Sequence, residues 1–275
     1  MPSKLNHILP DSGRTMQTIY EKNSPYPQQF SPEMDLPAHD GPTRTYLIAS
    51  TARSGSHMLG HLLKDAGPFG VPLEYLHHGN LKLWMHRFGT DDPQAALREV
   101  IRHRTGATGW FGLKAHWHQF FPFRKNHGIE VLGDLRTVLW IYRRDILGQA
   151  ISYTIAAQTG QWISGAPRKA EPRYDYDAIA RCLNNLRAEN NYWSIFLSKQ
   201  NLPVLRIAFE DLVDPIIRPG LMTRILARLD ARPQEPQQAF EPARTQKQSA
   251  SINEEWREAW LSEVPEERLP MTTLA

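Results

Sequence analysis

The stretch YLIASTARSGSHMLG, residues 46–60, decides the fold that we expect for the rest of the chain. It opens with four apolar residues, as in a buried strand, and residues 50–56 then form a small, hydroxyl-rich turn that contains one cation. Apolar residues return at helical spacing over residues 57–64. A strand, a small-residue loop and a helix in this order direct backbone N–H groups and a positive helix end toward a phosphate.

The loop differs from the Walker A loop of nucleoside triphosphatases. The pattern GxxxxGK[ST] does not occur in the chain, and the turn is instead a shorter Arg-Ser-Gly-Ser sequence at 53–56. The sequence therefore predicts a phosphate-binding loop of another class.

The composition is that of an ordinary globular protein. Its 275 residues, 41% of them hydrophobic and 22% charged, suffice for one large α/β domain. The net charge of +3 permits an anionic ligand, but the basic residues are spread along the chain, which disfavours nucleic-acid binding. Cys182 is the sole cysteine, so no intramolecular disulfide can form. Because the sequence has neither a signal-peptide pattern nor a membrane-spanning apolar run, we expect a cytoplasmic protein.

Residues 1–43 are expected to form an extended arm that precedes a domain at 44–275. Five prolines between positions 25 and 42 disfavour regular structure there. We expect the arm to be disordered in isolation or laid over a neighbour. Three aromatic residues, Tyr20, Tyr26 and Phe30, could anchor it to a surface.

Strand and helix patterns alternate through the domain. Further strand patterns lie at 110–115, 136–142 and 203–208. Helical patterns lie at 80–88, 91–104, 146–158, 177–200, 221–229 and 254–261. This alternation predicts an α/β fold, a P-loop-like three-layer sandwich with a central, mostly parallel sheet and helices on both faces.

Polar residues follow the strands where each one ends. Lys114 and His116 lie at the end of one strand, and Arg143 and Arg144 follow the next. Ligands of such sheets bind beyond the carboxyl ends of the strands, so these residues should converge with the loop on one site. The expected site is rich in cations and hydroxyls and contains no metal-ligand set, which predicts a polyanionic ligand and no metal.

These same places carry a resemblance to sulfotransferases that use 3′-phosphoadenosine 5′-phosphosulfate (PAPS). Within them, RSGS followed by the turn GVPLEY at 70–75 resembles the bacterial trehalose 2-sulfotransferase (Stf-zero type) family. FGLKAHWHQ at 111–119 and KQSASINEEW at 247–256 look like later blocks of that family, so the resemblance spans about 45–260.

The resemblance implies a role for each matching residue. Ser54, Gly55 and Ser56 cradle the 5′-phosphosulfate, and His57 continues that loop where the family has Thr or Ser. Arg53 faces the bridging and sulfuryl oxygens, and Glu74 is the catalytic base. The residues implied for the 3′-phosphate and for a late loop that closes over the cofactor are Arg144, Ser152, Lys247 and Gln248. The product would be 3′-phosphoadenosine 5′-phosphate (PAP), and the family also implies a homodimer.

His57, Lys247 in place of Arg, and the additional arm depart from the family pattern. Together they suggest an acceptor other than trehalose, and a carbohydrate or glycolipid fits the resemblance equally. Lys114, His116 and Trp162 are our candidates for contacting that acceptor, although core packing or surface exposure would explain them as well.

Other interpretations stay open at this point. Glu74 could be a solvated turn residue, and a histidine could replace it as the base. His57, His61, His77 and His78 could suggest a metal, although hydrogen-bonded histidines explain them better. Two other functions are a P-loop-like nucleotide kinase, disfavoured because the Walker lysine is missing, and a catalytically silent nucleotide-binding protein.

Overall fold

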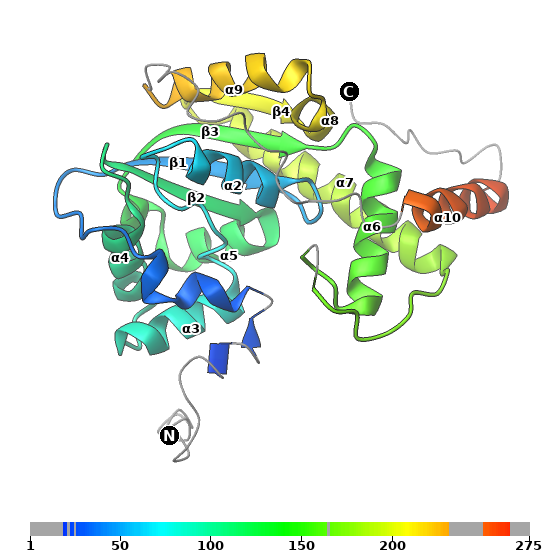
Figure 1. The fold of residues 1–275 in the computed structure, drawn as a ribbon, viewed down its shortest axis with the longest axis horizontal. Coiled ribbons are helices and arrows are strands. Elements are labelled where there is room, and N and C mark those ends of the chain that lie inside the picture. Colours follow the sequence, from blue (N-terminus) through cyan, green and yellow to red (C-terminus); the bar gives the residue numbers. More distant parts are fainter. Residues whose placement is uncertain (1–18, 21–22, 25, 164–165, 231–249, 265–275) are drawn as a thin grey trace.

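A single parallel sheet forms the centre of the protein. The computed structural model describes residues 19–20, 23–24, 26–163, 166–230 and 250–264. Within them the sheet has four strands in the order β2-β1-β3-β4, and every pairing is parallel (Figure 1). The strands are β1 (Arg44–Ser50), β2 (Trp110–His116), β3 (Asp134–Tyr142) and β4 (Val204–Ala208). The predicted α/β fold with a mostly parallel sheet is therefore confirmed.

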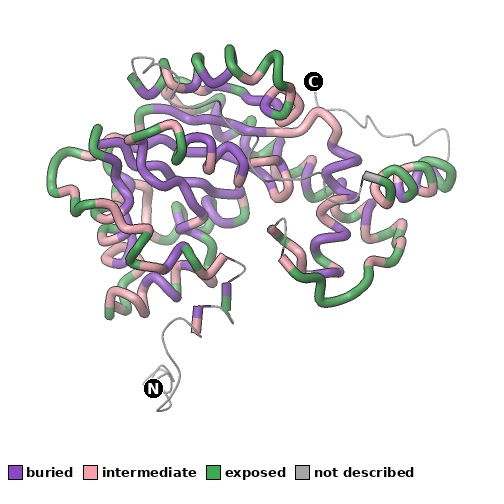
Figure 2. Tube along the Cα trace, viewed as in Figure 1, coloured by how far each residue is buried: buried purple, intermediate pink, exposed green. Residues whose placement is uncertain are grey.

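Helices cover both faces of the sheet, and the strand pattern explains why. Along β1, Leu47 and Ala49 pack into one apolar cluster, whereas Tyr46 and Ile48 pack into another on the opposite face. Buried residues accordingly run along the strands (Figure 2). The first cluster also draws on α3 (His78–Phe88), α4 (Pro93–Arg104), α5 (Trp117–His127) and α7 (Tyr176–Ser198). The second draws on α2 (Ser56–Asp65), α8 (Phe209–Val213) and α9 (Ile217–Arg228).

A third apolar cluster lies beyond the carboxyl ends of the strands. It joins α6 (Ile146–Thr159), the first half of α7 and α10 (Ala250–Glu263), as Figure 1 shows beside the sheet. Trp256 and Trp260 of α10 are both buried in it. The side chain of Asp145, which caps α6 by accepting from the Gly148 amide at 2.9 Å, also contacts Arg257. Helix α10 is therefore fixed next to the strand ends where the ligand is expected.

Helix α5 does not follow from any sequence pattern. Pro122 lies inside it, and proline normally disfavours a helix interior. The buried side chains of Phe120 and Phe123 compensate by packing into the first apolar cluster. Tertiary packing thus outweighs local propensity here.

The described part of the N-terminal arm packs against the domain. Short 3-10 helices lie at η1 (Pro27–Phe30) and η2 (Pro32–Met34). Tyr20 and Phe30 are only 5% and 1% exposed and belong to the first apolar cluster. These residues of the arm therefore pack against the domain through aromatic side chains, while the disorder of the arm in isolation and the domain boundary at 43/44 remain predictions.

Polar contacts fasten the arm as well. Asp35 contacts Arg87 of α3, and it lies 3.0 Å from Arg104 of α4, whose side chain is fully buried. Arg104 also donates a 2.8 Å hydrogen bond to the Gln29 carbonyl. No helix in the described ranges is both long and apolar enough to cross a membrane.

Candidate active site

The loop between β1 and α2 has the backbone conformation of a tight anion-binding turn. Arg53 has a φ of 62°, unusual for a residue with a side chain, and Gly55 has a φ of 88° directly before α2. A Cβ at Gly55 would lie 2.2 Å from the Phe209 ring, so both the conformation and the close packing require glycine. The structure therefore contains the predicted strand, small-residue loop and helix in this order.

Donors in this loop point to an anionic ligand. The first amides of α2 lack carbonyl partners within the helix, as at any helix start, and they carry its positive dipole end. The Ser54 hydroxyl is completely buried and makes no hydrogen bond within the described residues. Gln149 of α6 fixes the loop by donating to the Thr51 hydroxyl at 2.8 Å and the Ala52 carbonyl at 2.6 Å. The loop is therefore held against α6 and presents hydrogen-bond donors of the kind that bind an anion.

The Arg53 side chain extends from the loop toward α6. Its Nε donates to the Ser152 hydroxyl at 3.1 Å, and its Nη1 donates to the Trp162 carbonyl at 2.7 Å. Burial and the nearby Arg143 lower the pKa of Arg53, because two cations lie close together away from water. The structure thus brings Arg53 and Ser152 into direct contact, a pairing that the sequence did not predict.

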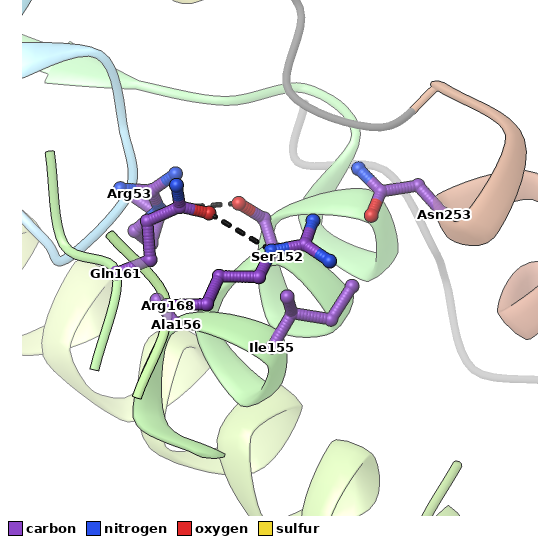
Figure 3. A pocket seen from close by; sticks show the side chains of 7 residues that line it. All are labelled: Arg53, Ser152, Ile155, Ala156, Gln161, Arg168 and Asn253. Carbon is purple, nitrogen blue, oxygen red and sulfur yellow. Dashed lines mark hydrogen bonds between the residues drawn. The ribbon is translucent and has the colours of Figure 1, made fainter. Parts of the chain in front are cut away.

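Arg53 and Ser152 open onto a small cavity, which we call the arginine cavity (Figure 3). Its lining consists of Arg53, Ser152, Ile155, Ala156, Gln161, Arg168 and Asn253. The sequence did not single out Gln161, Arg168 and Asn253. The cations at Arg168 and Lys169 were the available signal for one of them, but no local pattern places these three residues beside α6.

Arg144 lies elsewhere. Its guanidinium donates to both carboxylate oxygens of Asp211 at 2.7 Å, whereas the Ser152 hydroxyl accepts from Arg53. Arg143 stacks over the Phe209 ring at 4.5 Å and lies near Arg53. The role of Arg144 at a phosphate remains a prediction.

Glu74 is held at the far side of the loop by the edge of the sheet. Leu73 pairs with Leu113 of β2, and the Lys114 amide donates to the Leu73 carbonyl at 3.0 Å. The preceding turn is tight: a Cβ at Gly70, whose φ is 80°, would lie 2.5 Å from the Arg104 carbonyl oxygen. This turn places the Glu74 side chain at the carboxyl end of β2.

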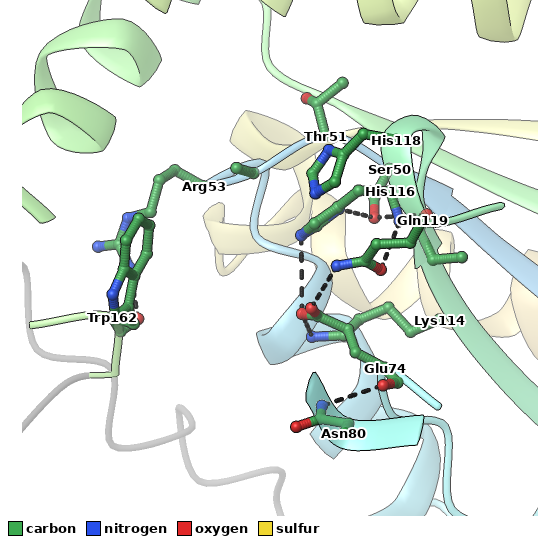
Figure 4. Close-up of polar contacts among 12 residues, drawn as sticks. Ser50, Thr51, Arg53, Glu74, Asn80, Lys114, His116, His118, Gln119 and Trp162 are labelled. Atoms are coloured by element: carbon green, nitrogen blue, oxygen red, sulfur yellow. Dashed lines mark hydrogen bonds and ion pairs between the residues drawn. The ribbon is translucent and has the colours of Figure 1, made fainter. Parts of the chain in front are cut away.

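Four side chains form what we call the carboxylate cluster: Glu74, Lys114, His116 and Gln119 (Figure 4). Lys114 Nζ lies 2.8 Å and His116 Nε2 lies 3.6 Å from Glu74 Oε1, and Gln119 donates to Oε2 at 2.9 Å. The His116 Nδ1 atom is 2.9 Å from the Ser50 hydroxyl. The structure therefore brings together three residues that the sequence singled out and adds Gln119.

Charge keeps Glu74 ionised. Burial alone would raise the pKa of its carboxyl, but Lys114, His116 and the two hydrogen bonds outweigh burial and hold that pKa well below its usual range. Burial lowers the pKa of His116, although Glu74 opposes the change. The Glu74 side chain is 26% exposed, so it is only partly open to solvent.

His57 packs between the loop and the arm. Its Nε2 lies 3.0 Å from Nε2 of His61, and the Tyr26 ring meets the His57 ring edge-on at 5.6 Å. Burial, with Lys114 as the next contribution, lowers the pKa of His57 to about 3, so its imidazole is neutral at physiological pH. Its described contacts are to other side chains of α2 and the arm.

The remaining sequence candidates are placed as follows. Trp162 is 39% exposed, and its ring meets that of Tyr153 edge-on at 5.8 Å, so it offers an exposed aromatic face. Lys247 and Gln248 lie outside the described residues. Within those that are described, no group of three or more His, Cys, Asp or Glu side chains could hold a metal ion.

Comparison with known proteins now adds to this geometry. A family model described as Stf0 sulphotransferase matches residues 45–263. The chain belongs to this family. The match extends from the strand before the phosphate loop to the end of α10, so it contains both the arginine cavity and the carboxylate cluster.

Relatives of this sulfotransferase include two proteins named trehalose 2-sulfotransferase. The protein of Mycobacterium tuberculosis (strain ATCC 35801 / TMC 107 / Erdman) is 27% identical over 269 residues, covering 82% of this chain and 98% of that protein. That of Mycolicibacterium smegmatis (strain ATCC 700084 / mc(2)155) is 26% identical over 273 residues, covering 84% and 99%. Among solved structures, the sulfotransferase domain of the Synechococcus PCC 7002 olefin synthase matches with 17% identity and a TM-score of 0.46, covering 85% of this chain and 93% of that domain.

Proposed function

We propose that this sulfotransferase moves the sulfuryl group of PAPS to a hydroxyl of a carbohydrate or glycolipid acceptor. One observation carries the proposal: the tight loop before α2 contains Arg53 and a buried Ser54 hydroxyl that makes no hydrogen bond within the described residues. A donor with an anionic group to be held fits these hydrogen-bond donors. The donor supplies the activated sulfuryl group. The protein therefore has to hold the donor, orient the acceptor hydroxyl and accept its proton.

The loop would bind the 5′-phosphosulfate. Backbone amides at the start of α2, with Ser54, Gly55 and Ser56, can donate to the oxygens of a tetrahedral anion. Arg53 would exchange one of its hydrogen bonds to Ser152 or Trp162 for a donor oxygen. Fixed donors of this kind stabilise the charge that develops on the departing phosphate without having to reorganise.

Glu74 would be the general base. Its Oε atoms accept hydrogen bonds from Lys114 and Gln119, and a carboxylate has further lone pairs for an acceptor hydroxyl. In the transfer step Glu74 accepts the hydroxyl proton while the acceptor oxygen bonds to sulfur and the bond from sulfur to the phosphate oxygen breaks. The low pKa of Glu74 limits its strength as a base, but it ensures that the carboxylate is ionised whenever an acceptor arrives.

The acceptor class rests on relatives and on exposed side chains. Both curated relatives are named for the sulfation of trehalose, a sugar. Trp162 presents an exposed aromatic surface suited to a sugar ring, and Lys114 and His116 lie beside Glu74. His57 continues the loop without a hydroxyl and contacts the arm, which supports an acceptor different from trehalose. A homodimer and a cytoplasmic location remain predictions from the sequence.

A transfer assay tests this function. The full chain is incubated with sulfate-labelled PAPS and a panel containing trehalose, other disaccharides and glycolipids, and products are detected by mass spectrometry. We expect an added sulfate on at least one acceptor and inhibition by PAP. A kinase would instead transfer phosphate from ATP with Mg²⁺, and a catalytically silent protein would bind PAP yet transfer nothing.

A further inference from the structure

The N-terminal arm reaches the candidate active site at two places, and the inference drawn from them rests on the proposed function. The family match begins at residue 45, so the arm lies outside it. We propose that the arm positions the active site: Ser24, acting through Asn80, holds the turn that carries Glu74, and Tyr26 supports the loop that binds the donor. The first contact affects the rate of transfer, and the second affects the affinity for the donor.

A chain of hydrogen bonds joins the arm to the Glu74 backbone. Gln29 Nε2 donates to the Ser24 hydroxyl at 3.1 Å, and this hydroxyl donates to Asn80 Oδ1 at 3.4 Å. Asn80 Nδ2 then donates to the Glu74 carbonyl at 3.0 Å (Figure 4). The side chains of Ser24, Gln29 and Asn80 are all buried, so water competes little for these hydrogen bonds.

The same hydrogen bonds determine which way the Asn80 amide faces. The Ser24 oxygen accepts from Gln29 Nε2 and from the Tyr26 backbone amide at 3.2 Å, so its one hydrogen is left for Asn80. Asn80 Oδ1 therefore faces Ser24, and its Nδ2 faces the Glu74 carbonyl. If the amide were turned over, two oxygens would meet at that carbonyl and a hydrogen bond would be lost. The arm thus orients the group that holds the Glu74 backbone.

The turn at Glu74 is held on both sides. Before it, Leu73 pairs with β2, and after it, Asn80 in the first turn of α3 donates to its carbonyl. The carboxylate cluster fixes the side chain of Glu74, but the backbone decides where that side chain starts. A misplacement of about 1 Å by a residue far from the chemistry can lower a rate about 100-fold. Ser24 and Asn80 are therefore positioning residues that act through Glu74.

The Tyr26 ring makes the second contact. It meets the rings of His57 and His61 edge-on, with centroids at 5.6 Å and 6.3 Å. His57 directly follows Ser56, the last residue of the loop that we propose to bind the 5′-phosphosulfate. Because edge-on aromatic contacts are favourable, Tyr26 restrains the first turn of α2, whose amides face the donor. Only the backbone of Tyr26 contacts Ser24, so the two contacts of the arm can be tested separately.

The first contact is tested by Ser24→Ala and Asn80→Asp in the full chain. The matched control is Ser31→Ala, which removes an arm hydroxyl that contacts Glu33 of the arm itself. We expect kcat for sulfuryl transfer to fall about 3- to 10-fold in Ser24→Ala, the effect of one hydrogen bond. Asn80→Asp keeps the shape but has no amide donor for the Glu74 carbonyl, so kcat should fall about 10- to 100-fold. PAP affinity, measured by calorimetry, should stay within about threefold of wild type in all three variants.

Tyr26→Ala should show the opposite result. PAP affinity should fall about 3- to 10-fold, the effect of one aromatic contact, while kcat at saturating donor stays within about twofold. Tyr26→Phe keeps the ring and should restore the PAP affinity. An equal loss of PAP affinity in Tyr26→Phe and Tyr26→Ala, or a fall in kcat as large as that of Ser24→Ala, would overturn the role of the Tyr26 ring.

Hydrogen exchange of the peptide that covers residues 71–80 adds a readout that needs no acceptor. Exchange should be faster in Ser24→Ala than in Ser31→Ala. Equal exchange or equal kcat in these two variants would overturn the role of Ser24. Melting curves establish folding beforehand, and Ser24→Thr, which keeps the hydroxyl, replaces Ser24→Ala if the latter unfolds and should then retain the wild-type exchange. If the wild type neither bound PAP nor transferred sulfate, the proposed function would fail, whereas the exchange experiment would still decide whether the arm holds the Glu74 turn.

Discussion

The carboxylate cluster and the arginine cavity lie on different sides of the same loop. They differ in whether their cations are paired with a carboxylate. In the cluster, Lys114 is matched by Glu74 at 2.8 Å, so the charges are satisfied within the protein. In the cavity, Arg53 and Arg168 face Ser152 without a lining carboxylate among the described residues. Pairing with Lys114 keeps Glu74 ionised, whereas an arginine without a carboxylate partner can bind an anionic ligand. The cluster contains the proposed general base, and Arg53 beside Ser152 lies where we propose that the donor binds.

Replacing Glu74 by glutamine should have the largest effect. Glutamine keeps the shape but cannot accept the proton, so turnover should fall about 100- to 10,000-fold. PAP affinity should remain nearly unchanged, because the cavity does not contain this residue. Steady-state kinetics and calorimetry measure the two effects. Near-normal turnover would remove Glu74 from its role, and a large loss of PAP affinity would contradict the separation of the two sites.

Removing the Asp35 carboxylate tests whether the arm is part of the folded unit beside the cluster. Asp35→Ala leaves the buried Arg104 without its carboxylate, which typically costs about 3–5 kcal/mol of folding free energy. The matched control is Asp40→Ala, whose pair with Arg102 is exposed, so its loss should change the stability little. Urea unfolding compares the two. Equal stabilities for both variants would show that the arm does not contribute to the fold.

Gly55→Ala tests the donor side of the loop. The added Cβ meets the Phe209 ring in a conformation that favours glycine, so the loop must distort. We expect PAP affinity to fall at least about tenfold, as for the loss of one strong hydrogen bond to the phosphate. Gly220→Ala on α9 is the control, since its added Cβ would have nothing within 4 Å. PAP titration by thermal shift measures both, and equal PAP affinities would contradict the assignment of the loop.

Lys114→Met tests the pairing within the cluster and should change the pH dependence more than the maximal rate. The pKa of Glu74 is lowered in the folded protein. The carboxylate is therefore ionised at any pH above this pKa, and it becomes protonated only when the pH falls below it. Without the Lys114 cation, burial dominates and raises this pKa, so the acid limb of kcat/KM should move to higher pH. Lys82→Met, at an exposed position on α3, is the control. An acid limb that stays in place would show that Lys114 does not set the ionisation of Glu74.

The sequence predicts well whatever depends on local pattern. Residues 46–60 specify a strand, a tight turn and a helix through neighbouring residues alone, and the structure contains all three. The turn at Glu74 was identifiable through the resemblance of GVPLEY at 70–75 to the family. The pairing of Glu74 with Lys114 needed one further step, the expectation that parallel strand ends meet at one edge.

Long-range contacts limited the rest. Arg168 enters the cavity because the segment after α6 folds back, which no nearby residue specifies. The spacing of Arg144 and Ser152 in the sequence matches the family pattern, but the Arg144 side chain donates a hydrogen bond to Asp211, which follows β4. The sequence left open whether the arm is disordered or lies over a neighbour, because the partners of Asp35 in α3 and α4 and of Phe30 in the apolar core are far away in the sequence.

Donor selectivity of the wild-type protein tests the central claim most directly. Calorimetry compares PAP with ATP in the presence of Mg²⁺ under identical salt. The loop and the arginine cavity together predict that PAP binds about 10- to 100-fold more tightly, because the 3′-phosphate gains a charge-assisted contact that ATP cannot make. Binding of Mg²⁺ and ATP as tight as that of PAP, or tighter, would contradict the proposed use of PAPS as the donor.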